Sequence, residues 1–288
     1  MAISPMQHLS LVLPTNLMDE LLLSLQSEES VQIYDLSAQE DWQVAFQTSD
    51  RTKGLAQRLD ELRRREEQLE KAIQALEPFI PQKKGLEKLK EAPLSLSFQE
   101  LESHGLIRDE QRLLQSVQKQ LAVLAKARDR IQLAQEELAS LEKWVDLTTT
   151  PDQLKRFRYV RGLIGTIPNS EQDQARQALL AHPDVEVDVV FSSETEHGVV
   201  VLYKSGDLAG IQDTLTSSHF KEFDYQGEAL PKERLEQLKR EIKEQGAVEA
   251  ATLETLSQAK EDLNQLKYQL DYVLSLGVRE EAKGFLAS

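Results

Sequence analysis

The stretch LAQRLDELRRREEQLEKAIQALEPFI (residues 55–80) decides the fold, because its apolar residues recur at alternating steps of three and four. These steps repeat every seven residues, which places the apolar side chains in one narrow seam along an α-helix. An isolated helix cannot bury such a seam, so the pattern predicts a partner helix. The seam consists of Leu55, Leu59, Leu62, Leu69, Ile73, Leu76 and Ile80, with Glu66 in its one polar position.

Two further seams follow. Residues 109–146 and 231–276 show the same spacing, and with residues 51–77 they predict three long helices that form an arm rather than a compact enzyme. The third seam falters around Gly246, and Gly277 is expected to cap its helix. The apolar positions are Leu114, Val117, Leu121, Leu124, Ile131 and Leu138, then Leu235, Leu238, Ile242, Leu253, Leu256, Leu263, Leu266, Leu270 and Val273.

Polar side chains at seam positions are the most informative polar residues of the helices. They are Glu66, Arg128, Gln135 and Glu249. A polar residue in a buried seam lowers stability but can fix the register of two helices. Loose packing or exposure at a bend explains the same pattern, so both interpretations stay open.

Composition limits the partners. Of the 288 residues, 40% are hydrophobic, 6% aromatic and 29% charged, which is typical of chains that pack along thin seams. There is no cysteine, which excludes disulfides and thiolate zinc sites. The net charge of −15 is concentrated in residues 1–50 and 146–228. Acidic surfaces repel phosphate backbones and anionic lipid, so we expect no nucleic-acid partner. The acidic charge fits either binding to a partner protein with a basic surface or a simple gain in solubility.

The N-terminal 50 residues predict part of an α/β lobe. Residues 6–13 and 31–36 have strand character, and the stretch between them predicts a short helix that buries Leu17, Leu21, Leu22 and Leu25. Two strands and a helix cannot bury a core alone, so this βαβ unit needs further strands. The N-terminus lacks a basic region, and no apolar run reaches the roughly 18 residues of a membrane helix, so we expect neither a signal peptide nor a membrane span.

Residues 156–226 predict a second lobe of a different kind. Strands are expected at 158–167, 185–191, 198–203 and 220–225, and helices at 171–182 and 207–217. The order β-α-β-β-α-β is the ferredoxin-like plan. The aromatic residues near these strands are expected in the core or at a protein contact, because the lobe is too acidic to stack nucleobases. They are Phe157, Tyr159, Phe220, Phe223 and Tyr225.

The sequence lacks the common motifs for phosphate binding, metal binding and catalysis. There is no GxxxxGK[ST] or GxGxxG motif, and GLIG at 162–165 reads as a strand with two glycines rather than a nucleic-acid loop. The five histidines have no metal-ligand spacing, and His197 reads as a turn residue. Carboxylate pairs such as Glu233 and Glu236 read as solvated helix faces. We therefore predict no catalytic, metal or cofactor-binding residue.

The order of these elements resembles the N-terminal half of subunit I, also called subunit a, of V-type ATPases. The resemblance rests on MQHLSLVLP, LLLSLQ and VQIYDL near the N-terminus, then GLIGTIP (162–168), VEVDVVF (185–191) and FKEFDYQGEALPKERLEQLKREI (220–242). It covers essentially the whole chain, and the order of elements carries it rather than any one motif.

The resemblance implies an α+β fold in which a long antiparallel helical coiled-coil bundle joins two small α/β lobes. It implies a non-catalytic stator and linker segment on the cytoplasmic face of a membrane complex. Such a segment ties peripheral-stalk subunits to the ion-translocating sector. The family's membrane half, with its essential arginine, would follow Ser288 and has no counterpart here.

The expected organisation has four parts. Residues 1–50 form part of a lobe, 51–150 the long helices and their connector, 151–228 the ferredoxin-like lobe, and 229–288 a third long helix truncated before a membrane domain. The main alternative is a free coiled-coil scaffold that dimerises through its α/β lobe. An RNA-binding ferredoxin-like protein is a weaker alternative, and no residue supports an enzyme.

Overall fold

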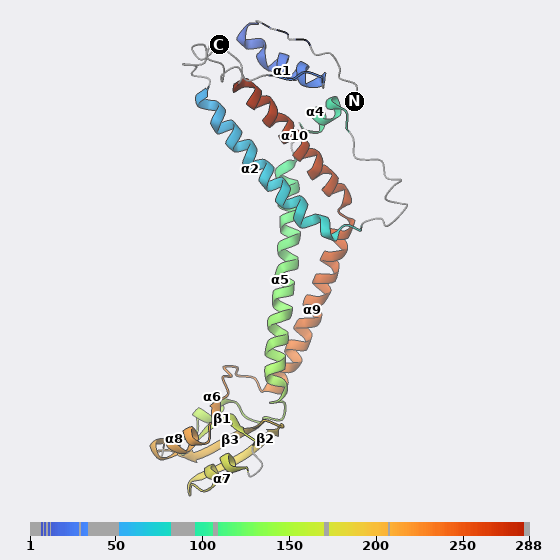
Figure 1. The fold of residues 1–288 in the computed structure, drawn as a ribbon. Coiled ribbons are helices and arrows are strands. Elements are labelled where there is room, and N and C mark those ends of the chain that lie inside the picture. The colour runs from blue at the N-terminus through green and yellow to red at the C-terminus, as the bar shows by residue number, and fades with distance from the viewer. Residues whose placement is uncertain are drawn as a thin grey trace. The chain divides into compact units, whose positions relative to one another are not determined.

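The computed structural model describes residues 7, 9, 11, 13–28, 30–33, 52–81, 96–105, 109–169, 173–206 and 208–284. The chain divides into two compact units (Figure 1). Unit 1 contains Met1–Val123 and Thr252–Ser288, and unit 2 contains Leu124–Ala251. The fold is α+β, since long helices accompany one small antiparallel sheet.

Unit 1 is helical in its described residues. It holds a 3-10 turn η1 (Thr15–Leu17), helix α1 (Met18–Ser27), helix α2 (Thr52–Leu76), turn η3 (Glu77–Phe79), helix α4 (Phe98–Gly105) and helix α10 (Lys260–Gly284). It also contains the start of helix α5 (Glu110–Glu142) and the end of helix α9 (Pro231–Gln258).

Helices α2 and α10 lie side by side and run antiparallel (Figure 1). Glu77 near the end of α2 pairs with Lys267 of α10 at 2.9 Å, while Arg58 near the start of α2 pairs with Glu280 at 3.7 Å. Part of the predicted seams is buried here: the exposed fractions of Leu69, Leu76, Leu263, Leu266 and Val273 are all 6% or less, while Leu59 and Leu62 are half-buried. The heptad spacing thus identified the apolar faces that meet.

Unit 2 contains the sheet. After the second part of α5 come helix α6 (Pro151–Lys155), strand β1 (Val160–Pro168), helix α7 (Gln174–Leu180), strands β2 (Val185–Ser192) and β3 (Glu196–Lys204), helix α8 (Leu208–Ser217) and strand β4 (Lys221–Glu222). The strand order is β2-β3-β1-β4, and every pairing is antiparallel. The order of helices and strands in 156–226 agrees with the sequence expectation.

Both faces of the sheet are buried, which explains the continuous apolar run of β3. Val199 and Val201 point to one face, where Leu179 of α7 and Ile211 of α8 cover them. Val200 points to the other face, against Trp144 and residues around α6. A strand buried on both sides needs apolar residues at consecutive positions rather than at alternate ones.

A third apolar cluster joins α5 to α9 within unit 2. Leu141 of α5 lies with Leu235 and Leu238 of α9, and Phe223 and Tyr225 pack against them. The Phe223 ring stacks on Trp144, with ring centroids 4.3 Å apart. One aromatic residue therefore connects the sheet's core to the helix pair.

The structure departs from a local reading of the sequence at three elements. Residues 98–105, which lie in the expected connector between long helices, form α4. The last strand, expected at 220–225, is only Lys221–Glu222, because beyond it Phe223 turns to the aromatic cluster. Strict alternation along β2 would place Phe191 on the same face as Val187, but a register shift between Val189 and Phe191 turns its ring toward Trp144.

The third long helix also differs from expectation. It divides at Ala259, whose N–H donates to Leu256 O at 3.2 Å, a three-residue step that interrupts the α-helical pattern. The chain then stays helical through Gly277 to Gly284. Arg279 and Lys283 beyond Gly277 make side-chain contacts with other helices, and these outweigh the roughly 1 kcal/mol cost of a glycine inside a helix.

The N-terminal strands stay predictions. Residues 7, 9, 11 and 13 of the first strand and residues 31–33 of the second are described and lie outside any strand. The remainder of both stretches lies outside the described residues. The helix between them is present as α1, in which Leu22 is buried and Leu17 is 43% exposed.

Candidate functional site

Chemistry-bearing side chains do not converge into a metal site in the described part of the chain. No group of three or more His, Cys, Asp or Glu side chains there could hold an ion. Glu233 and Glu236 are exposed on α9, as expected for a solvated face. The polar residues that do gather form three other arrangements: a histidine network, a charge cluster on α10 and arginine clamps between helices.

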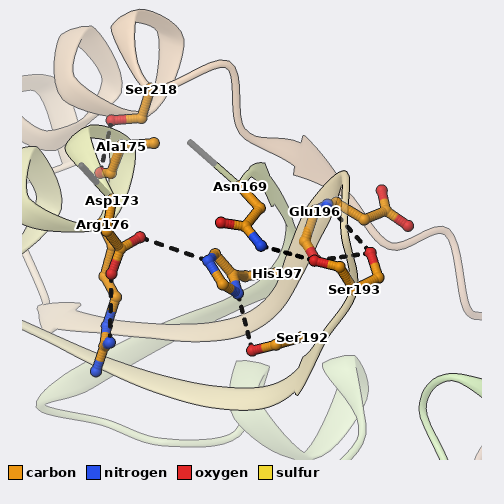
Figure 2. Close-up of polar contacts among 9 residues, drawn as sticks. All are labelled: Asn169, Asp173, Ala175, Arg176, Ser192, Ser193, Glu196, His197 and Ser218. Carbon is orange, nitrogen blue, oxygen red and sulfur yellow. Dashed lines mark hydrogen bonds and ion pairs between the residues drawn. The ribbon is translucent and has the colours of Figure 1, made fainter. Parts of the chain in front are cut away.

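The histidine network surrounds His197 (Figure 2). His197 lies in β3 rather than in a turn, opposite Ser192 of β2. Its Nδ1 atom is 2.9 Å from the Ser192 hydroxyl, and its Nε2 atom is 3.5 Å from a carboxylate oxygen of Asp173. The other oxygen of Asp173 contacts Arg176 at 3.4 Å. Asp173 has φ 50°, a left-handed conformation that is uncommon for a non-glycine residue.

This network holds the β2–β3 hairpin against the start of α7. Ser193 accepts a hydrogen bond from Glu196 N–H and donates one to Glu196 O, which closes the hairpin, and the Asn169 side chain donates to Ser193 O at 2.7 Å (Figure 2). Ser192 and His197 meet because they are cross-strand neighbours, whereas a catalytic serine needs room for a substrate beside it. We interpret the Ser, His and Asp side chains as a structural brace.

The charge cluster on α10 lies within unit 1. Arg279 donates to Gln26 of α1 at 2.8 Å and also contacts Glu102 of α4. Lys283 pairs with Asp19 of α1 at 2.6 Å and with Glu280 at 2.5 Å. The side chains of Arg279 and Lys283 are only 14% and 15% exposed. Two cations of one helix therefore hold two shorter helices.

Electrostatics keep Lys283 charged in this cluster. Burial, the largest influence, favours the neutral amine, but hydrogen bonds to Asp19 and Glu280 prevail and raise the pKa of Lys283. A depression of about 350 Å³ lies beside Lys283, lined also by Leu23 and Leu276. Its cations already have carboxylate partners, so the arrangement fits attachment of α1 better than capture of a ligand.

Arginine clamps join helices at two places. Arg65 of α2 donates two hydrogen bonds to Glu110 at the start of α5, at 3.1 and 2.6 Å. Arg234 of α9 donates two to Glu137 of α5, both at 2.7 Å. In each clamp the hydrogen bonds to glutamate raise the arginine pKa above its already high ordinary value. A two-pronged arginine–carboxylate pair fixes orientation as well as distance.

Two of the four polar seam residues form a pair. Arg128 of α5 and Glu249 of α9 lie 2.7 Å apart, with 52% and 26% of their side chains exposed. Together with Glu137–Arg234, this pair shows that α5 and α9 run antiparallel within unit 2. Next to Arg128 and Gln135, the buried residues of α5 are Ala127 and Ala134, each one position earlier. Glu66 is half-buried and Gln135 is exposed, so neither of them interrupts a fully buried seam.

The chain between β4 and α9 forms a second depression in unit 2. Its volume is about 570 Å³, and Phe223, Tyr225, Glu137 and Arg234 lie among its lining residues. The Tyr225 hydroxyl donates to Ala229 O at 2.7 Å, and burial raises the pKa of Tyr225. The Tyr225–Ala229 and Arg234–Glu137 hydrogen bonds already pair polar groups of the lining. We therefore interpret this depression as part of the connection between β4, α5 and α9.

A surface stretch of unit 2 has a different character. Residues 155–161 (KRFRYVR) link α6 to β1, and every one of them is exposed. Phe157 is 53% exposed and Tyr159 74%, whereas Phe223 is half-buried in the core. Core and contact roles were both open for these aromatic residues from the sequence, and the structure separates buried from exposed rings.

The similarity of this chain to known proteins lies among solved structures. No protein-family model matches the sequence, and no curated protein does. One similar solved structure is described as the crystal structure of the cytoplasmic N-terminal domain of subunit I, homolog of subunit a, of V-ATPase. The identity is 16% and the TM-score 0.48, with 94% of this chain and 87% of that chain covered. No helix within the described residues is long and apolar enough to cross a membrane.

Proposed function

We propose that this chain is a non-catalytic stator and linker segment of a V-type ATPase. The observation that carries the proposal is that the arginine clamps and the charge cluster on α10 connect helices to one another. Arg65, Arg234, Arg279 and Lys283 each join one helix to another. Such contacts resist displacement of helices, which is what a static arm in a rotary machine requires.

The family resemblance noted in the sequence supports the same role. GLIGTIP forms β1, VEVDVVF forms most of β2, and the stretch from Phe220 leads through β4 into α9. On this proposal the sheet of unit 2 is a ferredoxin-like lobe and the paired helices are an antiparallel coiled coil. Peripheral-stalk subunits bind the chain, the chain connects them to the membrane ion-translocating sector, and the site of action is the cytoplasmic face of a membrane.

Co-precipitation from native membranes tests the proposal. An antibody against this chain should recover, from detergent-solubilised membranes, the ATP-hydrolysing subunits of a V-type ATPase together with its peripheral stalk. A cell in which residues 151–228 are deleted should hydrolyse ATP in those membranes without coupled ion transport. If the antibody recovers the chain without any rotary-ATPase subunit, the stator proposal fails.

The alternative, a free scaffold that dimerises through its α/β lobe, makes a different prediction. Light scattering on the purified chain should then give twice its mass of 32.7 kDa. The stator proposal expects a monomer. A Phe157→Ala, Tyr159→Ala double variant shows whether any dimer uses the exposed aromatics of unit 2.

A further inference from the structure

Residues 155–161 of unit 2 form an exposed stretch, here called the basic aromatic patch. It carries four cations, Lys155, Arg156, Arg158 and Arg161, interleaved with two exposed aromatic rings. Residues 146–228 contain seven basic and 14 acidic side chains, so more than half of the basic ones fall within these seven positions. The patch is therefore a local positive surface on an acidic lobe.

Two of the four cations are already engaged. Lys155 pairs with Asp152 at 3.1 Å, and Arg161 donates to the Lys155 carbonyl oxygen at 2.7 Å. Among the described residues, no carboxylate lies within ion-pair distance of Arg156 or Arg158. The Arg158 guanidinium lies 5.7 Å from the centre of the Tyr159 ring, a cation–π arrangement. Arg161 keeps its charge, since a carbonyl oxygen is neutral, but its guanidinium is held against the backbone. Arg156 and Arg158 are therefore the two cations best placed to meet a partner's carboxylates.

The backbone beneath the patch is fixed. Thr150 and Gln153 form a reciprocal capping box at the start of α6, and Thr150 is fully buried. Leu154 is 3% exposed in the core beneath the sheet. Arg161 ties β1 back to the end of α6. The patch thus presents its side chains from a pre-organised support, which lowers the entropic cost of binding.

We propose that the basic aromatic patch docks an acidic segment of a partner protein, one that alternates carboxylates with apolar side chains. Two unpaired arginines fit a few carboxylates, and the Phe157 and Tyr159 rings supply the apolar contact. Arginine and tyrosine are among the residues that dominate binding energy at protein interfaces. As a statement about partner docking, this inference rests on the proposed linker function.

Other occupants fit less well. A nucleic-acid strand needs a continuous cationic groove, and the rest of this lobe is acidic. A membrane surface favours clusters of roughly four to eight Lys or Arg side chains. This stretch has four, Lys155 among them is paired with Asp152, and the rest of the lobe is acidic. A second copy of the chain would bring another acidic surface overall, so it is a less specific fit than a dedicated acidic segment.

Fluorescence anisotropy with the full chain tests the proposal. The probe is a fluorescein-labelled peptide of repeated Glu-Glu-Leu units, and its comparison probe is the Lys-Lys-Leu counterpart. The acidic peptide should bind and the basic one should not. The Arg156→Glu, Arg158→Glu variant should bind the acidic peptide at least about tenfold more weakly, and Phe157→Ala, Tyr159→Ala should weaken it several-fold.

Matched controls separate the patch from net charge and from exposed apolar surface. Lys239→Glu, Arg240→Glu changes the net charge by the same amount at two exposed positions of α9 in the same unit. Leu180→Ala removes an apolar side chain that is 48% exposed on α7. Both controls should leave the affinity for the acidic peptide unchanged.

Several outcomes would overturn the proposal. One is an equal loss of affinity in the Lys239→Glu, Arg240→Glu control; another is tighter binding of oligothymidylate or phosphatidylserine vesicles than of the acidic peptide. A dimer that dissociates in the Phe157→Ala, Tyr159→Ala variant would assign the patch to a second copy. The linker function is judged separately, because co-precipitation with the rotary ATPase does not depend on the peptide probe.

Discussion

The two units use the same residue types in different ways. In unit 2 the sheet is covered on both faces, and apolar side chains from the turn after α5 and from α6, α7 and α8 meet in its clusters. In unit 1 the short helices α1 and α4 are packed less fully: Leu22 is the one buried residue in the described part of α1, and Phe98 and Leu101 of α4 are half-buried. Charge contacts of Arg279 and Lys283 add to this partial packing. We therefore expect unit 2 to depend on packing and the periphery of unit 1 on ion pairs.

The largest effect is expected from a cavity in unit 2. Leu179→Ala removes a fully buried side chain between α7 and the sheet and should lower the free energy of unfolding by about 2 to 5 kcal/mol. Urea unfolding followed by Trp144 fluorescence measures it, in a Trp42→Phe background that leaves one tryptophan. Leu180→Ala, its exposed neighbour, should stay within about 0.5 kcal/mol. Equal losses in the two variants would contradict the assigned burial.

The next effect tests the ion pairs of unit 1. Arg279→Met leaves Glu102 and Gln26 without their donor and should cost about 1.5 to 3 kcal/mol, the usual range for hydrogen bonds to charged groups. Hydrogen exchange should show faster exchange of the α1 amides, while the amides of β1 and β3 keep their protection. Arg58→Met is the control, since that side chain is 56% exposed and its ion pair should be worth about 1 kcal/mol or less. Unchanged exchange in α1 would show that packing, not charge, holds it.

A smaller effect depends on pH. Because the folded-state pKa of Lys283 is raised, its contribution to stability is fully present below the ordinary lysine pKa and is lost as the pH rises through the folded-state pKa. Lys283→Met should therefore be less stable than the parent near pH 8, and the gap should narrow near pH 11. Lys71→Met, at a side chain 77% exposed, is the control.

The arginine clamp of unit 2 gives the opposite expectation for the same pH range. Arg234 keeps its charge throughout, so the gap between Arg234→Met and the parent should stay constant from about pH 8 to pH 11. Thermal unfolding at both pH values measures the two gaps. If the Lys283 gap is also constant, the lysine is not held by its charge.

The smallest effect is a gain in both units. A Cβ atom at Gly246 in unit 2 or at Gly277 in unit 1 would meet nothing within 4 Å, and both positions are helical. Gly246→Ala and Gly277→Ala should each stabilise the chain by about 0.5 to 1 kcal/mol. Gly198→Ala should do the reverse, since the Phe191 ring occupies the space of its Cβ atom. A loss at Gly277 would mean that α10 is not helical there.

Local patterns in the sequence were sufficient for the helices and for the order of the lobe. Heptad spacing identified α2 and α5 to within a few residues, because a seam depends only on neighbours along one helix. The alternation of strands and helices between 156 and 226 was equally readable, since Pro168 ends β1 and Pro183 lies between α7 and β2. Each of these features depends on residues that are close together in the sequence, and local patterns could therefore predict it.

Other features depend on contacts that local patterns do not contain. The division at Ala259 has no glycine or proline to announce it. Arg128 and Glu249 were recognised as unusual seam residues, but their pairing joins positions 121 residues apart. The exposure of Phe157 and the packing of Phe223 were not separable either, because both are aromatic residues near strand ends. Their surroundings, Arg156 and Arg158 for one and Trp144 for the other, decide the difference.

Unit 1 is built from two segments that are far apart in the sequence, and this affects the order in which its helices are synthesised. Lys267, which pairs with Glu77, is synthesised 190 residues later, roughly 10 to 40 s at ordinary ribosomal rates of about 5 to 20 residues per second. Unit 2 is complete before α10 exists, so it can fold on the ribosome while the apolar seam of α2 still has no α10 to cover it. Leu69 and Leu76 are then expected to be open to chaperones on the nascent chain. A circular permutant that begins at α10 is made with α10 ahead of α2, and it should shorten that exposure and aggregate less during synthesis.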